Sequence, residues 1–186
     1  MHRLFLILCL SVGLSACDVG APARARQDPA LERLFAQLGQ AQDAAAAAPL
    51  EAEIWARWAD SGSPTANILL ERANAAQSVG DSDLALRFLD RASALVPDFA
   101  EPWNRRATLA YDADDRPGAI AAIMETLKRQ PRHFAAMGAL GLIYEELGED
   151  RKALEAFRSA LAVHPFYELA LQGVRRLEPR VDGREA

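Results

Sequence analysis

Cysteine is almost missing from this chain: of 186 residues only Cys9 and Cys17 are cysteines, and both lie near the N-terminus. The rest of the chain therefore cannot form an internal disulfide or a thiolate metal site. The three histidines lack a zinc-ligand spacing, and there is neither a glycine-rich phosphate loop nor a nucleophile-elbow motif. We predict a protein that is not an enzyme and that binds no cofactor and no metal ion.

An excess of positive charge is also lacking, since the formal net charge is −5 and Lys and Arg are dispersed among acids. Proteins that bind nucleic acid usually carry a basic stripe that neutralises phosphates. We therefore predict no nucleic-acid partner and interpret the charges as a solvated helical surface. Aromatic residues make up only 7% of the chain, whereas alanine is abundant, which favours closely packed helices. No linker follows residue 30, so the length indicates one domain.

The N-terminus has the composition of a secretory signal. Arg3 precedes the apolar run 4–12, and small residues follow up to Cys17. The apolar run is too short for a transmembrane helix, which needs about 20 apolar residues. We expect residues 1–16 to be removed.

Residues 14–17, Leu-Ser-Ala-Cys, resemble the lipobox of bacterial lipoproteins. The resemblance implies that Cys17 is lipidated, that residues 17–28 form a flexible tether, and that the protein is anchored to a membrane facing the periplasm. Asp18 resembles the signal that retains lipoproteins of enteric bacteria in the inner membrane. Ser15 and Ala16 would also suit the general signal peptidase, so the alternative is a soluble periplasmic protein.

A repeat is the strongest pattern in the chain. Pro97, Pro131 and Pro165 recur at one constant interval, and a proline at such a place ends a helix pair. With each proline at position 32, the repeat divides the chain into units 66–99, 100–133 and 134–167. The third unit has Leu140-Gly141 at positions 7 and 8, and its other characteristic residues are Tyr144, Gly148, Ala153, Phe157 and Ala160.

These residues and their period resemble the tetratricopeptide repeat (TPR), in which small side chains let two helices approach and large ones fill the remaining space. The resemblance implies an all-α solenoid of antiparallel helix pairs, with three TPR units. Arg72 and Arg106 depart from the pattern at position 7, and Asp114 replaces the turn glycine of the second unit. Helix N-caps are expected near Asp81, Asp98 and Asp150.

Segments outside the three units are expected to close the solenoid. In residues 29–63 one helix is predicted over 29–47 and another after Pro49, and we interpret this hairpin as a divergent repeat or an N-terminal cap. Trp55 and Trp58 in the second helix favour a buried seam, although an exposed anchor for a partner is the alternative. Residues 166–178 are predicted to be a C-terminal capping helix, and 179–186 a disordered tail.

In TPR proteins the first helix of each unit lines a concave groove. The equivalent positions carry Asn67, Leu70, Asn74, Gln77, Glu101, Asn104, Thr108, Tyr111, Ala135, Gly138, Leu142 and Glu145. Asn side chains can pair with a peptide backbone in both directions. The resemblance implies a protein-protein interaction scaffold that binds a peptide segment or helix of an envelope protein. The alternative is a self-assembling subunit, with a homodimer formed through Trp55 and Trp58.

Overall fold

The computed structural model describes residues 28–183, and within this range it contains nine helices and no strand. The predicted leader, Cys17 and the tether as far as residue 27 lie outside the described residues. The helices are α1 (Pro29–Leu38), α2 (Ala44–Ala59), α3 (Pro64–Ser78), α4 (Ser82–Leu95), α5 (Glu101–Asp112), α6 (Arg116–Arg129), α7 (Phe134–Glu146), α8 (Asp150–Val163) and α9 (Glu168–Asp182).

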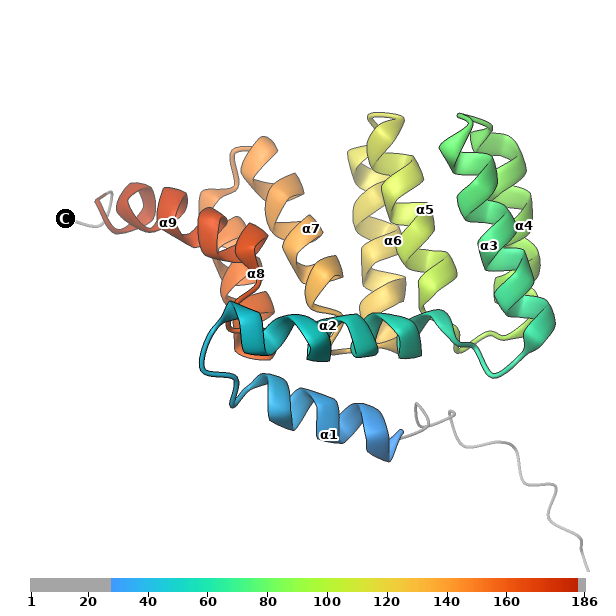
Figure 1. The fold of residues 1–186 in the computed structure, drawn as a ribbon. Helices are drawn as coiled ribbons and strands as arrows, with labels where there is room; N and C mark the ends of the chain where they lie inside the picture. The colour runs from blue at the N-terminus through green and yellow to red at the C-terminus, as the bar shows by residue number, and fades with distance from the viewer. Residues whose placement is uncertain (1–27, 184–186) are drawn as a thin grey trace, which may run out of the picture.

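Three antiparallel pairs, α3/α4, α5/α6 and α7/α8, stand side by side, and α9 packs against α8 and α7 (Figure 1). Neighbouring pairs are joined by contacts between the second helix of one pair and the first helix of the next: α5 packs on α4, and α7 packs on α6. The first helices also touch one another, α3 on α5 and α7 on α9. They therefore form the inner layer of the stack, where the predicted groove residues lie.

The tight turns within the pairs explain the glycine pattern and its one exception. Gly80 and Gly148 have φ of 79° and 75°, a left-handed conformation that costs glycine little because it lacks a Cβ. Asp114 adopts the same conformation, with φ of 62°. Aspartate tolerates this region better than most residues, so the turn survives the substitution.

Of the three expected N-caps, only Asp81 is one, because its carboxylate accepts a hydrogen bond from the backbone N–H of Leu84 at 2.9 Å. Asp98 does not cap α5, which begins after Ala100 without a side-chain cap. Asp150 is the first residue of α8, and its carboxylate instead accepts from Arg180 at 2.9 Å. The prediction failed for Asp150 because its partner comes from α9, in a later part of the chain.

The N-terminal hairpin forms with different boundaries from those predicted. The structure ends α1 at Leu38, and Pro49 lies inside α2 rather than before it. Asp43 caps α2 by accepting from the N–H of Ala46 at 2.8 Å. The alanine run that follows has the best helix propensity, and this outweighs the single hydrogen bond that an internal proline removes.

The hairpin does not stack on the first pair as a repeat or end cap would. Instead α2 crosses the ends of the helix pairs, with α1 beneath it (Figure 1), and packs on the loops that precede α7 and α9. The Trp58 ring stacks on His133 with centroids 4.1 Å apart, and Trp55 meets Phe134 edge-on at 5.9 Å. The Glu51 carboxylate lies 3.1 Å from Nε2 of His164. Trp58 is only 6% exposed, which agrees with the predicted buried seam and leaves little of this ring for the alternative, a dimer contact.

The C-terminal helix is longer than predicted, since α9 continues through Pro179 to Asp182. Residues 179–182 therefore belong to the cap and not to the predicted disordered tail. Val181 packs against the same core cluster as Phe157 and Leu177, and this contact extends the helix by one turn. Burial of an apolar side chain offsets the hydrogen bond lost at the proline.

Candidate functional site

A hollow lies between the inner helices of the second and third units. Its volume is about 110 Å³, comparable to a few water molecules or one aliphatic side chain. Four predicted groove residues line it: Asn104, Thr108 and Tyr111 from α5, and Leu142 from α7. The structure thus brings together side chains from two separate repeat units.

The floor of the hollow is apolar, and sequence reasoning did not identify it. It consists of Ala107, Ile123, Ala139 and Ile143. Ala139 occupies position 6 of its unit, where the other two units have the long side chains of Glu71 and Arg105. This short side chain, visible in the aligned repeats, was the available signal for a hollow at this place.

Polar contacts hold one wall of the hollow in place. The Tyr111 hydroxyl donates a short hydrogen bond to the Glu146 carboxylate, and the Arg116 guanidinium lies 4.2 Å from the Tyr111 ring centroid. Arg116 Nε also donates to Glu146 at 2.7 Å. The hydrogen bond to Glu146 raises the pKa of the Tyr111 hydroxyl. The ring is therefore fixed between two units, with its hydroxyl protonated at neutral pH.

Glu101 differs from the prediction, because it is 1% exposed and does not face a groove. Its Oε1 lies 2.9 Å from Nε2 of His133, whose Nδ1 accepts from the backbone N–H of Ala136 at 3.1 Å. Burial would raise the pKa of Glu101, but the His133 hydrogen bond and nearby positive charge hold it below its ordinary value. Asn104 Nδ2 donates to Oε2 of Glu101 at 3.3 Å, which orients the Asn104 amide beside the hollow.

The other predicted groove residues are placed in three ways. Leu70 is a core residue of the first unit, and Gly138 is buried beneath Tyr167. Asn67, Gln77 and Glu145 bond to neighbours within the chain: Asn67 to Asp60 and Ser61, Gln77 to Asp112, and Glu145 to Arg176 and Arg180. Asn74 is exposed on α3, and Ala135 is half-buried. Of the predicted groove residues, four therefore line the hollow between α5 and α7.

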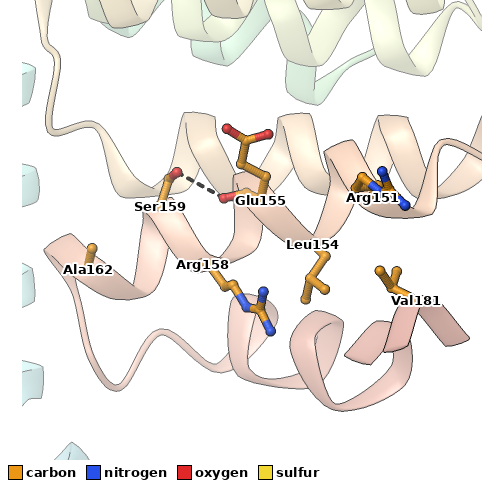
Figure 2. Close-up of a pocket in the computed structure, with 7 residues that line it drawn as sticks. All are labelled: Arg151, Leu154, Glu155, Arg158, Ser159, Ala162 and Val181. Carbon is orange, nitrogen blue, oxygen red and sulfur yellow. Dashed lines mark hydrogen bonds between the residues drawn. The ribbon is translucent and has the colours of Figure 1, made fainter. Parts of the chain in front are cut away.

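A larger and more open hollow lies on the outer surface. It measures about 530 Å³ and is lined by Arg151, Leu154, Glu155, Arg158, Ser159 and Ala162 from α8 and Val181 from α9 (Figure 2). Two of its polar side chains are engaged within the chain: the Ser159 hydroxyl donates to the Glu155 carbonyl at 2.9 Å, and Arg158 pairs with Glu178 at 2.6 Å. None of the predicted groove residues lines it, so it is a weaker candidate.

Residues 28–183 lack two other kinds of feature. No group of His, Cys, Asp or Glu side chains in this range could hold a metal ion. No helix in the same range is long and apolar enough to cross a membrane.

The fold and the hollow together define a class: a short helical-repeat protein with a hollow between the inner helices of two units. No family model matches the chain. A TPR repeat-containing protein of Rhizobium etli is 37% identical over 153 residues, which is 82% of this chain and 75% of that protein. The chain therefore belongs to the TPR repeat proteins, and the predicted all-α TPR solenoid is confirmed.

Solved structures agree with this fold. The TPR domain of Arabidopsis OM64 has a TM-score of 0.58 at 22% identity and covers 62% of this chain and 96% of that one. The first TPR domain of Spaghetti (RPAP3), bound to an HSP90 peptide, has a TM-score of 0.59 at 17% identity and covers 66% of this chain and 96% of that one. MamA has a TM-score of 0.57 at 23% identity and covers 66% of this chain and 71% of that one. At these identities the structures support the fold alone.

Proposed function

We propose that this protein is a non-enzymatic scaffold that binds an extended peptide segment of a partner protein in the hollow between α5 and α7. The observation that carries the proposal is the convergence of Asn104, Thr108, Tyr111 and Leu142 on one mostly apolar hollow. Members of this fold class bind peptides, as the Spaghetti domain does an HSP90 peptide.

The chemistry of the hollow describes the ligand it would suit. Its apolar floor favours one aliphatic side chain of the peptide, since burying such a side chain contributes about 1.5–3 kcal/mol. The Asn104 amide at the rim can exchange hydrogen bonds with a peptide backbone. Because Tyr111 is already held by Glu146, the ligand does not have to order this wall.

Filling the hollow tests this proposal. Ala139→Leu places a larger side chain on the floor, and we expect it to weaken capture of the partner at least about tenfold, because the ligand side chain loses its space. The measurement is photo-crosslinking in membranes with a reactive group at Thr108, followed by identification of the crosslinked protein.

Ala121→Leu is the matched control, since Ala121 is exposed on α6 and lies outside the hollow. This variant should capture the partner as wild type does. If Ala139→Leu gives the same crosslinks as wild type and as the control variant, the hollow is not the binding site.

We further propose that the scaffold is tethered to a bacterial envelope membrane through lipid on Cys17 and faces the periplasm, with the inner membrane favoured by Asp18. The support is the sequence alone, in which a cysteine follows the small pair Ser15 and Ala16. Two or more acyl chains would give stable attachment, at about 0.8 kcal/mol for each buried CH₂. Partners would then be proteins of the same envelope.

Cys17→Ser removes the proposed lipid site. We expect this variant to move from the membrane pellet to the soluble fraction after cell lysis, because a cut after Ala16 by the general peptidase would leave it without an anchor. The measurement is fractionation with metabolic labelling by a fatty-acid analogue. Cys9→Ser serves as the control and should stay labelled and membrane-bound. Labelling that persists in Cys17→Ser would contradict the tether.

A further inference from the structure

A buried carboxylate contacts one of the residues that line the hollow. Glu101 is the first residue of α5 and is 1% exposed, so its oxygens depend on hydrogen-bond donors from the protein. Oε1 lies 2.9 Å from Nε2 of His133, and Oε2 accepts from Nδ2 of Asn104 at 3.3 Å. The guanidinium of Arg105 lies 3.5 Å from the same Oε2. One carboxylate therefore joins the loop before α7 to a residue of the hollow.

The contacts of His133 fix the place of its proton. Nδ1 of His133 accepts from the backbone N–H of Ala136 at 3.1 Å, so this nitrogen carries no proton. The proton is therefore on Nε2, which donates to Oε1 of Glu101. The ring is fully buried, and Trp58 stacks on it with centroids 4.1 Å apart. His133 is thus held as a donor to Glu101.

The charge of Glu101 decides which way the Asn104 amide faces. Burial would raise the pKa of Glu101, but His133 and nearby positive charge hold it below its ordinary value, so the carboxylate is ionised at neutral pH. An ionised carboxylate only accepts hydrogen bonds, and Asn104 must therefore present Nδ2 to it. Oδ1 is left on the other side of the amide, where it accepts no hydrogen bond from any of the described residues.

We propose that Glu101 is a positioning residue for peptide binding, which holds the Asn104 amide so that Oδ1 accepts a hydrogen bond from a backbone N–H of the peptide in the hollow. This role rests on the proposed function and adds a requirement to it: the peptide must supply a donor at this point of the rim. A peptide with proline at that place would be rejected, because proline has no backbone N–H.

Glu101→Gln should reverse the Asn104 amide with little change in shape. The carbonyl of the new side chain accepts from His133, which is held as a donor, and its NH₂ group then faces Asn104. Asn104 must turn Oδ1 toward that NH₂ group, and the hollow loses its acceptor. The variant therefore changes the chemistry of the rim while the apolar floor stays as it is.

The probe is a short peptide selected from a random phage-displayed library on the full chain in mild detergent, and kept only if Ala139→Leu weakens its binding. In fluorescence anisotropy, Glu101→Gln should weaken this peptide about three- to tenfold, the range expected for the loss of one hydrogen bond. In an Asn104→Ala background the same change should have no effect, because no amide is left to turn. Glu155→Gln, at an exposed position of α8, is the matched control and should bind as wild type does.

Ester replacement of each backbone N–H of the probe, one at a time, tests the same hydrogen bond without depending on the stability of Glu101→Gln. One ester should weaken binding to wild type about three- to tenfold and leave binding to Asn104→Ala unchanged.

The outcomes separate the positioning role from the proposed function. A Glu101→Gln effect of equal size in both backgrounds would overturn the positioning role, because a general structural effect does not depend on Asn104. Esters that all act alike on wild type and on Asn104→Ala would overturn it too. A library that yields no peptide sensitive to Ala139→Leu would instead overturn the proposed function, and the positioning role with it.

Discussion

Phe157→Ala is expected to lower the free energy of unfolding by about 3–5 kcal/mol, because it leaves a large cavity in the third unit. Phe157 is 0% exposed, and its ring fills the space beside two glycines. A Cβ on Gly141 would lie 2.6 Å from a ring atom, and one on Gly173 would lie 2.4 Å away. The ring therefore joins α7, α8 and α9, and the two glycines beside it have no side chain that could refill its place.

Urea denaturation followed by far-UV circular dichroism measures this effect. For a domain of this size we expect the melting temperature to fall by about 10 °C as well. Leu147→Ala is the control: Leu147 is largely exposed at the end of α7, and its loss should change stability by at most about 0.5 kcal/mol. A change below about 1 kcal/mol for Phe157→Ala would show that the third unit is not packed as described.

Trp58→Ala is expected to release the N-terminal hairpin from the solenoid at a cost of about 3–5 kcal/mol. The Trp58 ring stacks on His133 and also contacts Trp55, Phe35 and Phe134, with centroids between 4.1 and 6.1 Å apart. Truncation removes this whole group of ring contacts. Because the hairpin packs on loops and not between helix pairs, it can detach as a unit while the repeats stay folded.

Hydrogen exchange of backbone amides distinguishes detachment from global unfolding. Amides of α1 and α2 should exchange at least about a hundredfold faster in Trp58→Ala, with those of α3–α6 little changed. Trp58→Phe keeps a ring against His133 and should show a smaller effect. Equal acceleration in all helices would mean that the hairpin and the repeats form one cooperative unit, and no acceleration would mean that Trp58 does not hold the hairpin.

The repeats were predictable because their information is local and periodic. The evenly spaced prolines end each pair, and the small residues at positions 8, 20 and 27 let the two helices of a pair approach. Gly141 is the clearest case, since its neighbour Phe157 lies on α8, the next helix along the chain. Packing between neighbours in sequence is what a repeat pattern encodes.

The candidate site was predictable only in part. Asn104, Thr108, Tyr111 and Leu142 were assigned to the groove from their repeat positions, and they do line the hollow. Glu101 was assigned by the same rule, but its side chain turns inward to His133, in the loop before the next unit. The position in a repeat determines where the Cα of a residue lies on its helix. Which residue its side chain contacts depends on the sequence of the loops and units around it.

Local patterns in the amino-acid sequence were enough to predict an all-α TPR solenoid with a polar helix at its C-terminal end. Helix propensity, small-residue spacing and proline periodicity each act within one unit at a time. The docking place of the N-terminal hairpin, in contrast, depends on contacts between distant parts of the chain. Its Trp58 and Glu51 find His133 and His164, which belong to the later units, and no local pattern records contacts at such separation. The same docking leaves Ile68 and Ala75 of α3 exposed, since a hairpin packed on the later loops cannot also cap the first pair.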